Sequence, residues 1–218
     1  MIQRKLEPLG LSHMDIGQLC LRDRSPEDFL PGSTGFDEFS RIREEGLVRR
    51  YVMEVFPWTS PVALQVLNDG GIGDLVDGFI FYFNPLQRFA SNALWQRIQE
   101  MNVPIIAMRT VCGDNVLNLR DVPGAAWQDY IQQRSVQVAP LFERSGIESW
   151  AEFCMRYVYS FDVVQASVGA TSREENLSEL LRHSETREAF PNNIKEELLA
   201  LQSGWSEELD ETAEPWSM

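Results

Sequence analysis

The chain has 218 residues, of which 44% are hydrophobic, and this size and composition favour one domain around one substantial core. The formal net charge of −14 argues against a surface that binds nucleic acid or an anionic membrane, because such surfaces need clustered Lys and Arg. No apolar run is long enough to cross a bilayer, so we expect no membrane contact.

The cysteines and histidines indicate a cytoplasmic protein without a metal. The three cysteines, Cys20, Cys112 and Cys154, lie far apart and are odd in number, which suits reduced thiols. The first ten residues lack the apolar segment of a signal peptide. Because the only histidines are His13 and His183 and there is no CxxC or HExxH pattern, we expect no metal site.

The first half of the chain alternates between helical patterns and short apolar runs. The expected elements, in chain order, are a helix that ends within 2–9, a strand over 14–19, a helix from Phe36, a strand over 50–55 and a helix from Pro61. Gly10 stops the first helix, and a polar loop with two prolines separates the first strand from the next helix.

The second half continues in the same way. The expected elements are a strand within 76–88, a helix around 95–101, a strand over 103–109, a helix near 126–134 in an otherwise irregular segment 113–145, a helix over 150–158, a strand over 163–168, a helix with Leu177, Leu180 and Leu181 facing inward, and a terminal helix over 194–201. The run 163–168 contains β-branched residues, so we expect this strand to be covered on both faces.

The domain is expected to comprise residues 1–203. Residues 204–218 are acidic, with no Lys or Arg, and we interpret them as a disordered, solubilising tail. Trp205 and Trp216 lie within this acidic segment, and the alternative is that they form a docking motif for another protein.

A loop of small residues, Gly169, Ala170, Thr171 and Ser172, joins the last predicted strand to the helix that follows it. Backbone N–H groups at a helix start can bind an anion, and a phosphate is the usual ligand at this place in a barrel. Ser172, with Glu three residues later, predicts a capping box. The next residue, Arg173, either binds a phosphate or is a solvated arginine, and both readings stay open.

Several segments, in this order, resemble the aldo/keto reductase family. LGLSHMDIGQLC over 9–20 is similar to the family's LGxDYIDLxxLH, VDGFIFYFNPLQR over 76–88 to VDxxQxxYNxLxR, and VPIIAMR over 103–109 to the seventh barrel strand. The loop 169–172 resembles the family's loop that holds the cofactor pyrophosphate. The resemblance covers most of residues 2–182 and begins at the helix before the fourth strand. It implies an α/β fold, an incomplete (β/α)₈ TIM-type barrel of about five parallel strands, and weak binding of NADP by Gly169–Arg173.

The same comparison shows departures from the family's catalytic pattern. The family's Tyr, Lys and Asp lie on the first three βα units, which the resemblance does not include, and its catalytic His falls on Cys20. The Ser-Asn pair that contacts the nicotinamide amide falls near Glu54 and Val55, and the Gln of the sixth strand falls on Ile80. We therefore expect no carbonyl reductase activity.

Four residues at predicted strand ends are candidates for other chemistry: Cys20, Glu54, Asn84 and Arg109. Cys20 is a candidate nucleophile, but a buried structural cysteine is the better interpretation, because the only histidine that follows it in the sequence is the distant His183. Glu54, with Asn84 and Arg109 on neighbouring strand ends, is a candidate general base or polar-ligand group. The alternative for Glu54 is a buried ion pair with Arg109 that fixes the barrel mouth.

Three hypotheses for function remain open. The first is a non-reductase binding or regulatory subunit with a residual phosphate or nucleotide site. The second is a redox-neutral enzyme that uses the strand-end residues. The third is a split or truncated NADP-dependent oxidoreductase that needs a partner chain. An incomplete parallel barrel has two unpaired edges, so we also expect a homo-oligomer, a partner chain or the segment 113–145 to cover them.

Overall fold

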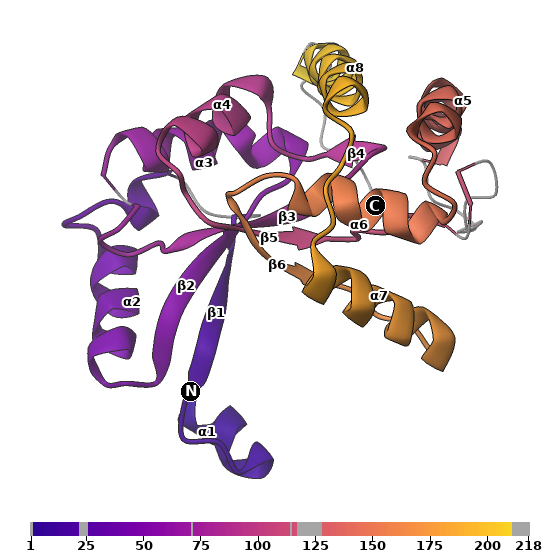
Figure 1. Ribbon diagram of the computed structural model, residues 1–218. Coiled ribbons are helices and arrows are strands. Elements are labelled where there is room, and N and C mark those ends of the chain that lie inside the picture. Colours follow the sequence, from indigo (N-terminus) through magenta and orange to yellow (C-terminus); the bar gives the residue numbers. More distant parts are fainter. Residues whose placement is uncertain (1, 22–25, 71, 114, 117–127, 211–218) are drawn as a thin grey trace.

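A computed structural model of the protein describes residues 2–21, 26–70, 72–113, 115–116 and 128–210. Five parallel strands form one sheet (Figure 1), and they lie in the order β1 (Met14–Cys20), β2 (Val48–Glu54), β3 (Gly78–Asn84), β5 (Ile105–Met108) and β6 (Val164–Val168). A short strand, β4 (Gln87–Arg88), pairs antiparallel with the end of β3. The expected α/β class and parallel sheet are confirmed, and each strand lies where the sequence predicted it.

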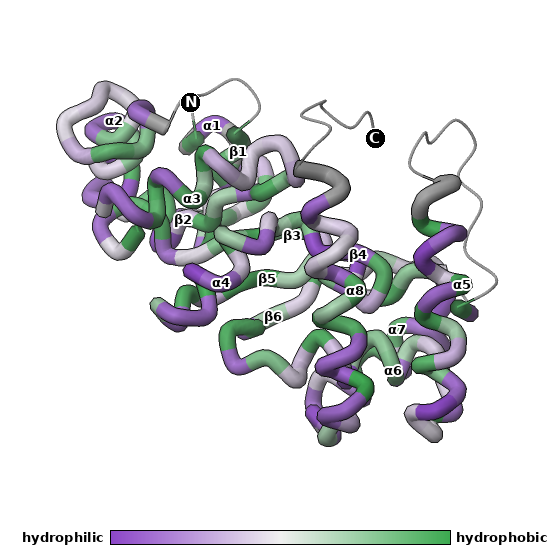
Figure 2. Tube along the Cα trace, turned by 90° about the horizontal axis from the view of Figure 1, so that it is seen from above, coloured by the Kyte–Doolittle hydropathy of each residue, from purple (hydrophilic) through white to green (hydrophobic). Residues whose placement is uncertain are grey.

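Helices follow the strands and pack around the sheet (Figure 1). They are α1 (Gln3–Leu6), α2 (Thr34–Glu44), α3 (Ser60–Asn68), α4 (Asn92–Glu100), α5 (Gln128–Ser145), α6 (Trp150–Tyr159), α7 (Glu174–Thr186) and α8 (Asn192–Asp210), with 3-10 helices at Glu7–Leu9, Pro26–Phe29 and Pro57–Thr59. In Figure 2 most strand residues are hydrophobic, whereas α4, α5 and α8 alternate between hydrophilic and hydrophobic residues. This pattern is typical of helices that cover a sheet with one face.

Serine side chains start three of these helices. Ser33 before α2, Ser91 before α4 and Ser149 before α6 each accept a hydrogen bond from a backbone N–H in the first turn, at 3.0, 3.3 and 3.3 Å. Such N-caps satisfy a donor that the helix itself cannot bond, and each stabilises a helix by about 1 kcal/mol. Local sequence therefore defines where the helices begin.

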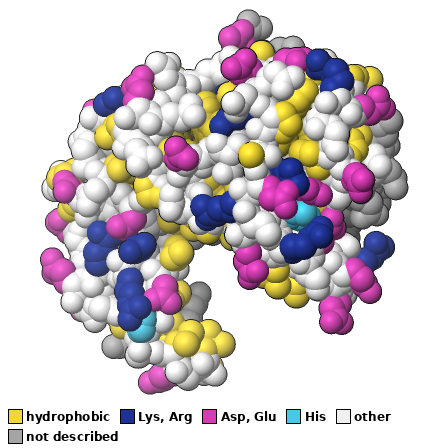
Figure 3. Space-filling view, viewed as in Figure 1, with side chains coloured by type: hydrophobic (Ala, Val, Ile, Leu, Met, Phe, Trp, Pro, Cys, Tyr) yellow, Lys and Arg dark blue, Asp and Glu magenta, His cyan; other side chains and the backbone are white. Residues whose placement is uncertain are grey.

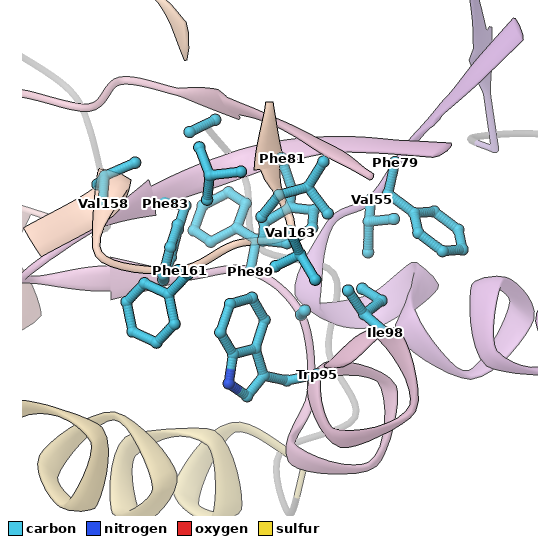
Figure 4. Packing of buried hydrophobic residues seen from close by; sticks show 14 of the residues in the cluster. Val55, Phe79, Phe81, Phe83, Phe89, Trp95, Ile98, Val158, Phe161 and Val163 are labelled. Carbon is cyan, nitrogen blue, oxygen red and sulfur yellow. The ribbon is translucent and has the colours of Figure 1, made fainter. Parts of the chain in front are cut away.

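The core centres on aromatic side chains between the sheet and its helices. Phe83 of β3 is fully buried, and Figure 4 shows its ring close to those of Trp95 and Phe161. The Phe83 ring centroid lies 5.0 Å from that of Trp95, 5.3 Å from that of Phe161 and 5.7 Å from that of Tyr157. Phe79 and Phe81 point to the same side of β3, since side chains alternate along a strand. Residues of β3 with even numbers, such as Ile80 and Tyr82, therefore face the opposite side, away from these helices.

The sheet is not closed into a barrel within the described residues. β1 and β6 are its two edges and do not pair with each other. Figure 3 shows the gap as a notch between the part of the molecule that carries α1 and β1 and the part that carries α7. The parallel strands and surrounding helices match an open TIM-barrel-type architecture.

The open edge corrects two expectations about β6 and α7. β6 is not covered on both faces: of its residues only Val164 is buried, and Val168 is 51% exposed. Two of the three leucines expected to face inward on α7 are also exposed, Leu177 at 50% and Leu181 at 53%, while Leu180 is half-buried. Both differences have one cause, because no strand of the described residues pairs with the outer side of β6.

The C-terminal helix is longer and more tightly packed than the sequence indicated. α8 continues to Asp210, past the expected boundary at residue 203. Trp205 is 6% exposed, donates a hydrogen bond from Nε1 to Gln137 at 2.9 Å, and lies under the guanidinium of Arg134 at 4.6 Å. Trp205 is therefore a core residue and not a docking motif in a tail. Residues 211–218, including Trp216, lie outside the described residues.

The segment 113–145 is also more helical than expected. Its predicted helix near 126–134 corresponds to α5, which begins at Gln128 and continues to Ser145, while 117–127 lie outside the described residues. α5 packs against α8, and Arg134 donates to the backbone oxygen of Leu86 at 3.1 Å. The described part of this segment thus packs on α8 and the β3–β4 turn.

Candidate site at the carboxyl ends of the strands

The parallel strands all end at the same edge of the sheet, where ligands bind in α/β proteins. Near this edge one row of register partners crosses the whole sheet. The row contains Cys20, Glu54, Ile80, Ile106 and Ala166 on β1, β2, β3, β5 and β6. Their side chains share the face that the core helices do not cover. The sequence-predicted pair Cys20 and Glu54 is thus brought together.

Cys20 is exposed, so the interpretation of this residue as a buried structural cysteine is wrong. Its exposure follows from its place on β1, which is an edge strand. Glu54 is half-buried, and its carboxylate forms no ion pair within the described part of the chain. The expected Glu54–Arg109 ion pair is therefore not formed, and Glu54 offers two acceptor oxygens on the open face.

Asn84 is fully buried and holds the turn between β3 and β4. Its Oδ1 accepts from the Leu86 N–H at 2.9 Å, while Nδ2 donates to Gln87 Oε1 at 3.2 Å and to the Arg109 backbone oxygen at 2.9 Å. A fourth bond, from Gln202 Nε2 of α8, reaches the Asn84 backbone oxygen at 2.9 Å. With its amide engaged in this way, Asn84 holds the β3–β4 turn beside the candidate site.

Arg109 follows β5 directly and adopts the left-handed backbone conformation, with φ of 49°. Its side chain is exposed, and its guanidinium lies 4.5 Å from the centroid of the Tyr82 ring, within the range of a cation–π contact. The Tyr82 ring is itself stacked on Phe89, with centroids 4.5 Å apart. An aromatic platform with a cation above it therefore stands at the end of β3 and β5.

The register between β5 and β6 brings the predicted phosphate-binding residues, 169–173, close to Arg109 at the end of β5. Met108 and Val168 are register partners, so Arg109 and Gly169 leave the sheet side by side. Gly169, Ala170, Thr171, Ser172 and Arg173 are all exposed. Two arginines and a loop of small residues thus lie at the ends of two neighbouring strands, which is a setting suited to an anion.

The start of α7 differs from the predicted capping box. Arg173, not Ser172, is the N-cap residue, and no side chain caps the helix. Thr171 Oγ1 accepts a hydrogen bond from the Arg173 N–H at 3.2 Å and so supports the loop. Glu174 and Glu175 in the first turn favour the helix dipole but oppose an anion, so a phosphate here depends on the two arginines.

Sequence reasoning missed two residues near this site. Tyr82 lies on the open face because it alternates with Phe81 and Phe83, and the alternation of residues 78–84 could have indicated this. Thr110 is 3% exposed, and its hydroxyl has no hydrogen-bond partner among the described residues. Nothing in the sequence pattern distinguishes Thr110 from an ordinary loop residue.

The described part of the chain contains no group of three or more His, Cys, Asp and Glu side chains arranged to hold a metal ion. Nor does it contain a helix that is both long and apolar enough to cross a membrane.

Three solved structures with a similar architecture are aldo-keto reductases. The match to AKR11C1 from Bacillus halodurans in its apo form has a TM-score of 0.67 at 19% identity and covers 92% of this chain and 66% of that one. The holo form gives 0.66 at 19% identity, with coverages of 92% and 65%. The chain has an aldo-keto reductase-like fold. An aldo-keto reductase from Klebsiella pneumoniae in complex with NADPH is also similar, with a TM-score of 0.61 at 17% identity and coverages of 93% and 63%.

The aldo-keto reductase-like chain spans less than two thirds of the length of the three structures, and identities of 17–19% make the likeness one of fold. No protein-family model matches the chain, and no curated protein is significantly similar to it in sequence. The resemblance inferred from short motifs is therefore supported at the level of three-dimensional structure.

Proposed function

We propose that this chain is a non-reductase binding or regulatory subunit with an aldo-keto reductase-like fold, and that it binds a small phosphorylated ligand at the ends of β5 and β6. The observation that carries the proposal is the Met108–Val168 register, which places Arg109 beside Gly169. The guanidinium of Arg109 and that of Arg173 would each donate charge-assisted hydrogen bonds to phosphate oxygens. Backbone N–H groups of the loop 169–172 would supply further donors.

NADP is the first candidate for the ligand, since one structure of this fold is a complex with NADPH. The residues fit the phosphate half of such a molecule better than its nicotinamide half. Ile80, in the row that crosses the sheet, offers no hydrogen bond, and Glu54 offers only acceptors. Tyr82 provides a ring on which a base or another planar group could stack, so we expect phosphates and a planar ring to dominate recognition.

The absence of reductase activity is part of the proposal. The described strand ends carry Cys20, Glu54, Asn84 and Arg109, and a reductase of the resembled family needs Tyr, Lys, Asp and His. A proton donor for carbonyl reduction must be tuned by neighbouring charges. Asn84 is committed to the β3–β4 turn, and Arg109 is not a proton donor at neutral pH.

A second candidate function rests on the Cys20–Glu54 pair. The two residues are register partners on the open face, with Cys20 exposed and Glu54 half-buried. Glu54 would act as a general base in a reaction without redox change, such as proton abstraction from a ligand that is bound through its phosphate. A Glu54→Gln variant would then lose turnover but keep ligand binding, whereas a binding subunit would show no turnover to lose.

A partner for the two sheet edges is also proposed. Val168, Leu177 and Leu181 at the β6 edge and Ile16 at the β1 edge are each about half exposed, at 49–53%. Unpaired strand edges and exposed apolar side chains favour association. A second copy of the chain or a separate chain would cover them, and an oxidoreductase assembled from such parts is the remaining alternative.

The test is a panel of ligands measured by calorimetry on the full chain. We expect NADP and 2′,5′-ADP to bind with similar affinity, and nicotinamide mononucleotide to bind much more weakly. NADPH oxidation with a panel of aldehydes is expected not to exceed that of a heat-inactivated sample. Steady NADPH oxidation would overturn the non-reductase proposal, and failure of NADP and 2′,5′-ADP to bind would overturn the proposed phosphate site.

A further inference from the structure

A chain of buried hydrogen bonds connects the C-terminal helix to the backbone of Arg109. Tyr157 of α6 donates its hydroxyl proton to Gln202 Oε1 at 2.9 Å. Gln202 Nε2 donates to the Asn84 backbone oxygen at 2.9 Å, and Asn84 Nδ2 donates to the Arg109 backbone oxygen at 2.9 Å. Tyr157, Gln202 and Asn84 are 0–2% exposed, so water does not compete for these bonds.

Arg109 needs such support because its backbone is in the left-handed region, with φ of 49°. A residue with a β-carbon adopts this conformation at a cost, and the surrounding structure must stabilise it. The Asn84 amide supplies a bond to the carbonyl oxygen of this same residue. Orientation of the Arg109 backbone in turn determines where the guanidinium lies, which is over the ring of Tyr82.

Further contacts from α5 and α8 meet the same turn between β3 and β4. Arg134 of α5 donates to the Leu86 backbone oxygen at 3.1 Å, and its guanidinium lies over Trp205 of α8 at 4.6 Å. Gln202 is thus one of several groups that hold the turn, and it connects α8 directly to Asn84, the residue that is bonded to Arg109.

We infer that Gln202 is a positioning residue: α8, far away in the sequence, sets the orientation of Arg109 at the strand ends through Asn84. The inference rests on the proposed function for its effect on ligand binding, but its effect on the Arg109 backbone is independent of any ligand. Loss of the Gln202 bond would leave the Asn84 carbonyl without its donor, loosen the turn and release the Arg109 carbonyl from Asn84 Nδ2.

The test compares Gln202→Met, which has a similar volume but no donor, with Ser206→Ala. Ser206 lies one turn later on α8 and accepts a partly buried hydrogen bond from the Asn92 N–H at 3.1 Å, so this control removes one bond from the same helix and none from Asn84. The first readout needs no ligand. Trypsin cleaves after Arg109 only when this peptide bond leaves its folded conformation, and cleavage after Arg156 within α6 reports opening of the core.

Gln202→Met removes the bond to the Asn84 oxygen and also the acceptor of the Tyr157 hydroxyl, but only the first of these bonds leads to Arg109. We expect the ratio of cleavage after Arg109 to cleavage after Arg156 to rise about fivefold in Gln202→Met, the factor that loss of the bond to Asn84 would give. The ratio should stay at the wild-type value in Ser206→Ala. An unchanged ratio in Gln202→Met would overturn the inference, whether or not the wild type binds a ligand. A rise in both variants would also overturn it, because the effect would then come from weakening α8 in general.

The second readout is affinity for 2′,5′-ADP in a double-mutant cycle with Arg109→Ala. If Gln202 acts through Arg109, Gln202→Met weakens binding in the wild-type background but has no further effect in the Arg109→Ala background. Equal effects in both backgrounds would show that Gln202 affects binding by another route and would overturn the positioning role. If the wild type does not bind 2′,5′-ADP, the proposed phosphate site fails, and the trypsin ratio alone decides this inference.

Discussion

Cys20 and Glu54 are register partners at the ends of β1 and β2, and both face the side of the sheet that the core helices leave uncovered. In a closed barrel this face would be interior, so residues of this row would be hidden from water. Here β1 is an edge, and Cys20 is exposed. The openness of the sheet therefore has a direct chemical consequence for the thiol.

We predict that the three cysteines differ strongly in reactivity. Cys20 is exposed, whereas burial raises the pKa of the Cys112 thiol to about 11 and raises the pKa of the fully buried Cys154 thiol well above its ordinary value. At pH 8 a disulfide reagent should therefore label one thiol per chain quickly and the other two slowly. Cys20→Ser should abolish the fast phase, while Cys112→Ser should leave it intact. A fast phase that persists in Cys20→Ser would contradict the open face.

Packing of Trp205 predicts that α8 is integral to the domain. Trp205→Ala removes a ring that contacts Arg134 and Gln137, and it should lower the free energy of unfolding by about 3–5 kcal/mol, as for other buried aromatic residues. Val136→Ala on α5, where the side chain is 65% exposed, serves as the control and should change stability little. Urea unfolding measures both variants. Equal stability of Trp205→Ala and wild type would show that α8 does not pack as described.

His183 predicts a dependence of stability on pH. Burial lowers the pKa of this imidazole from its ordinary value of 6.5, so the unfolded chain takes up a proton at a higher pH than the folded chain does. The contribution of His183 is therefore fully present above pH 6.5 and is lost as the pH falls below that value. In urea unfolding between pH 7.5 and 5.5, His183→Gln should lose less stability on acidification than the wild type. A wild-type curve no steeper than that of the variant would contradict this assignment.

The exposed edge at β6 and α7 predicts association in solution. Light scattering on the wild type should give a mass above that of one chain, or a partner should copurify. Leu177→Ser together with Leu181→Ser should shift the chain toward the monomer, because both side chains are about half exposed on α7. Val136→Ser, an exposed change on α5, should not. A clean monomer mass for the wild type without a partner would contradict the proposed edge contact.

The sequence was sufficient to predict the parallel α/β fold because each strand is a short apolar run between recognisable helix signals. The strand Ile105–Met108, for example, pairs in parallel with Val164–Val168, the next strand along the chain, as the family resemblance implies. The exposure of individual side chains was less predictable. Leu177 and Leu181 have the spacing of an inward face, but which face of α7 is covered depends on a strand that no residue described here supplies.

The candidate site was predicted only in part, because its contacts too depend on neighbours in three dimensions. Sequence patterns place Glu54, Asn84 and Arg109 at strand ends, but they do not specify which side chain bonds to which. Asn84 turned out to bond the backbone of Arg109, and the expected ion pair of Glu54 is not formed. Trp205, set among acidic residues, has the composition of a tail, and only its contacts with α5 reveal a core residue.

The central claim is that the ends of β5 and β6 form a phosphate site, and calorimetric titration of 2′,5′-ADP into four proteins tests it most directly. The proteins are the wild type, Arg109→Ala, Arg173→Ala and the control Arg41→Ala, which removes an exposed arginine on α2. We predict binding to the wild type and to Arg41→Ala, and a loss of about 1–3 kcal/mol in Arg109→Ala and in Arg173→Ala, the range for a charge-assisted hydrogen bond. Absence of binding to the wild type, or unchanged affinity in both site variants, would contradict the claim.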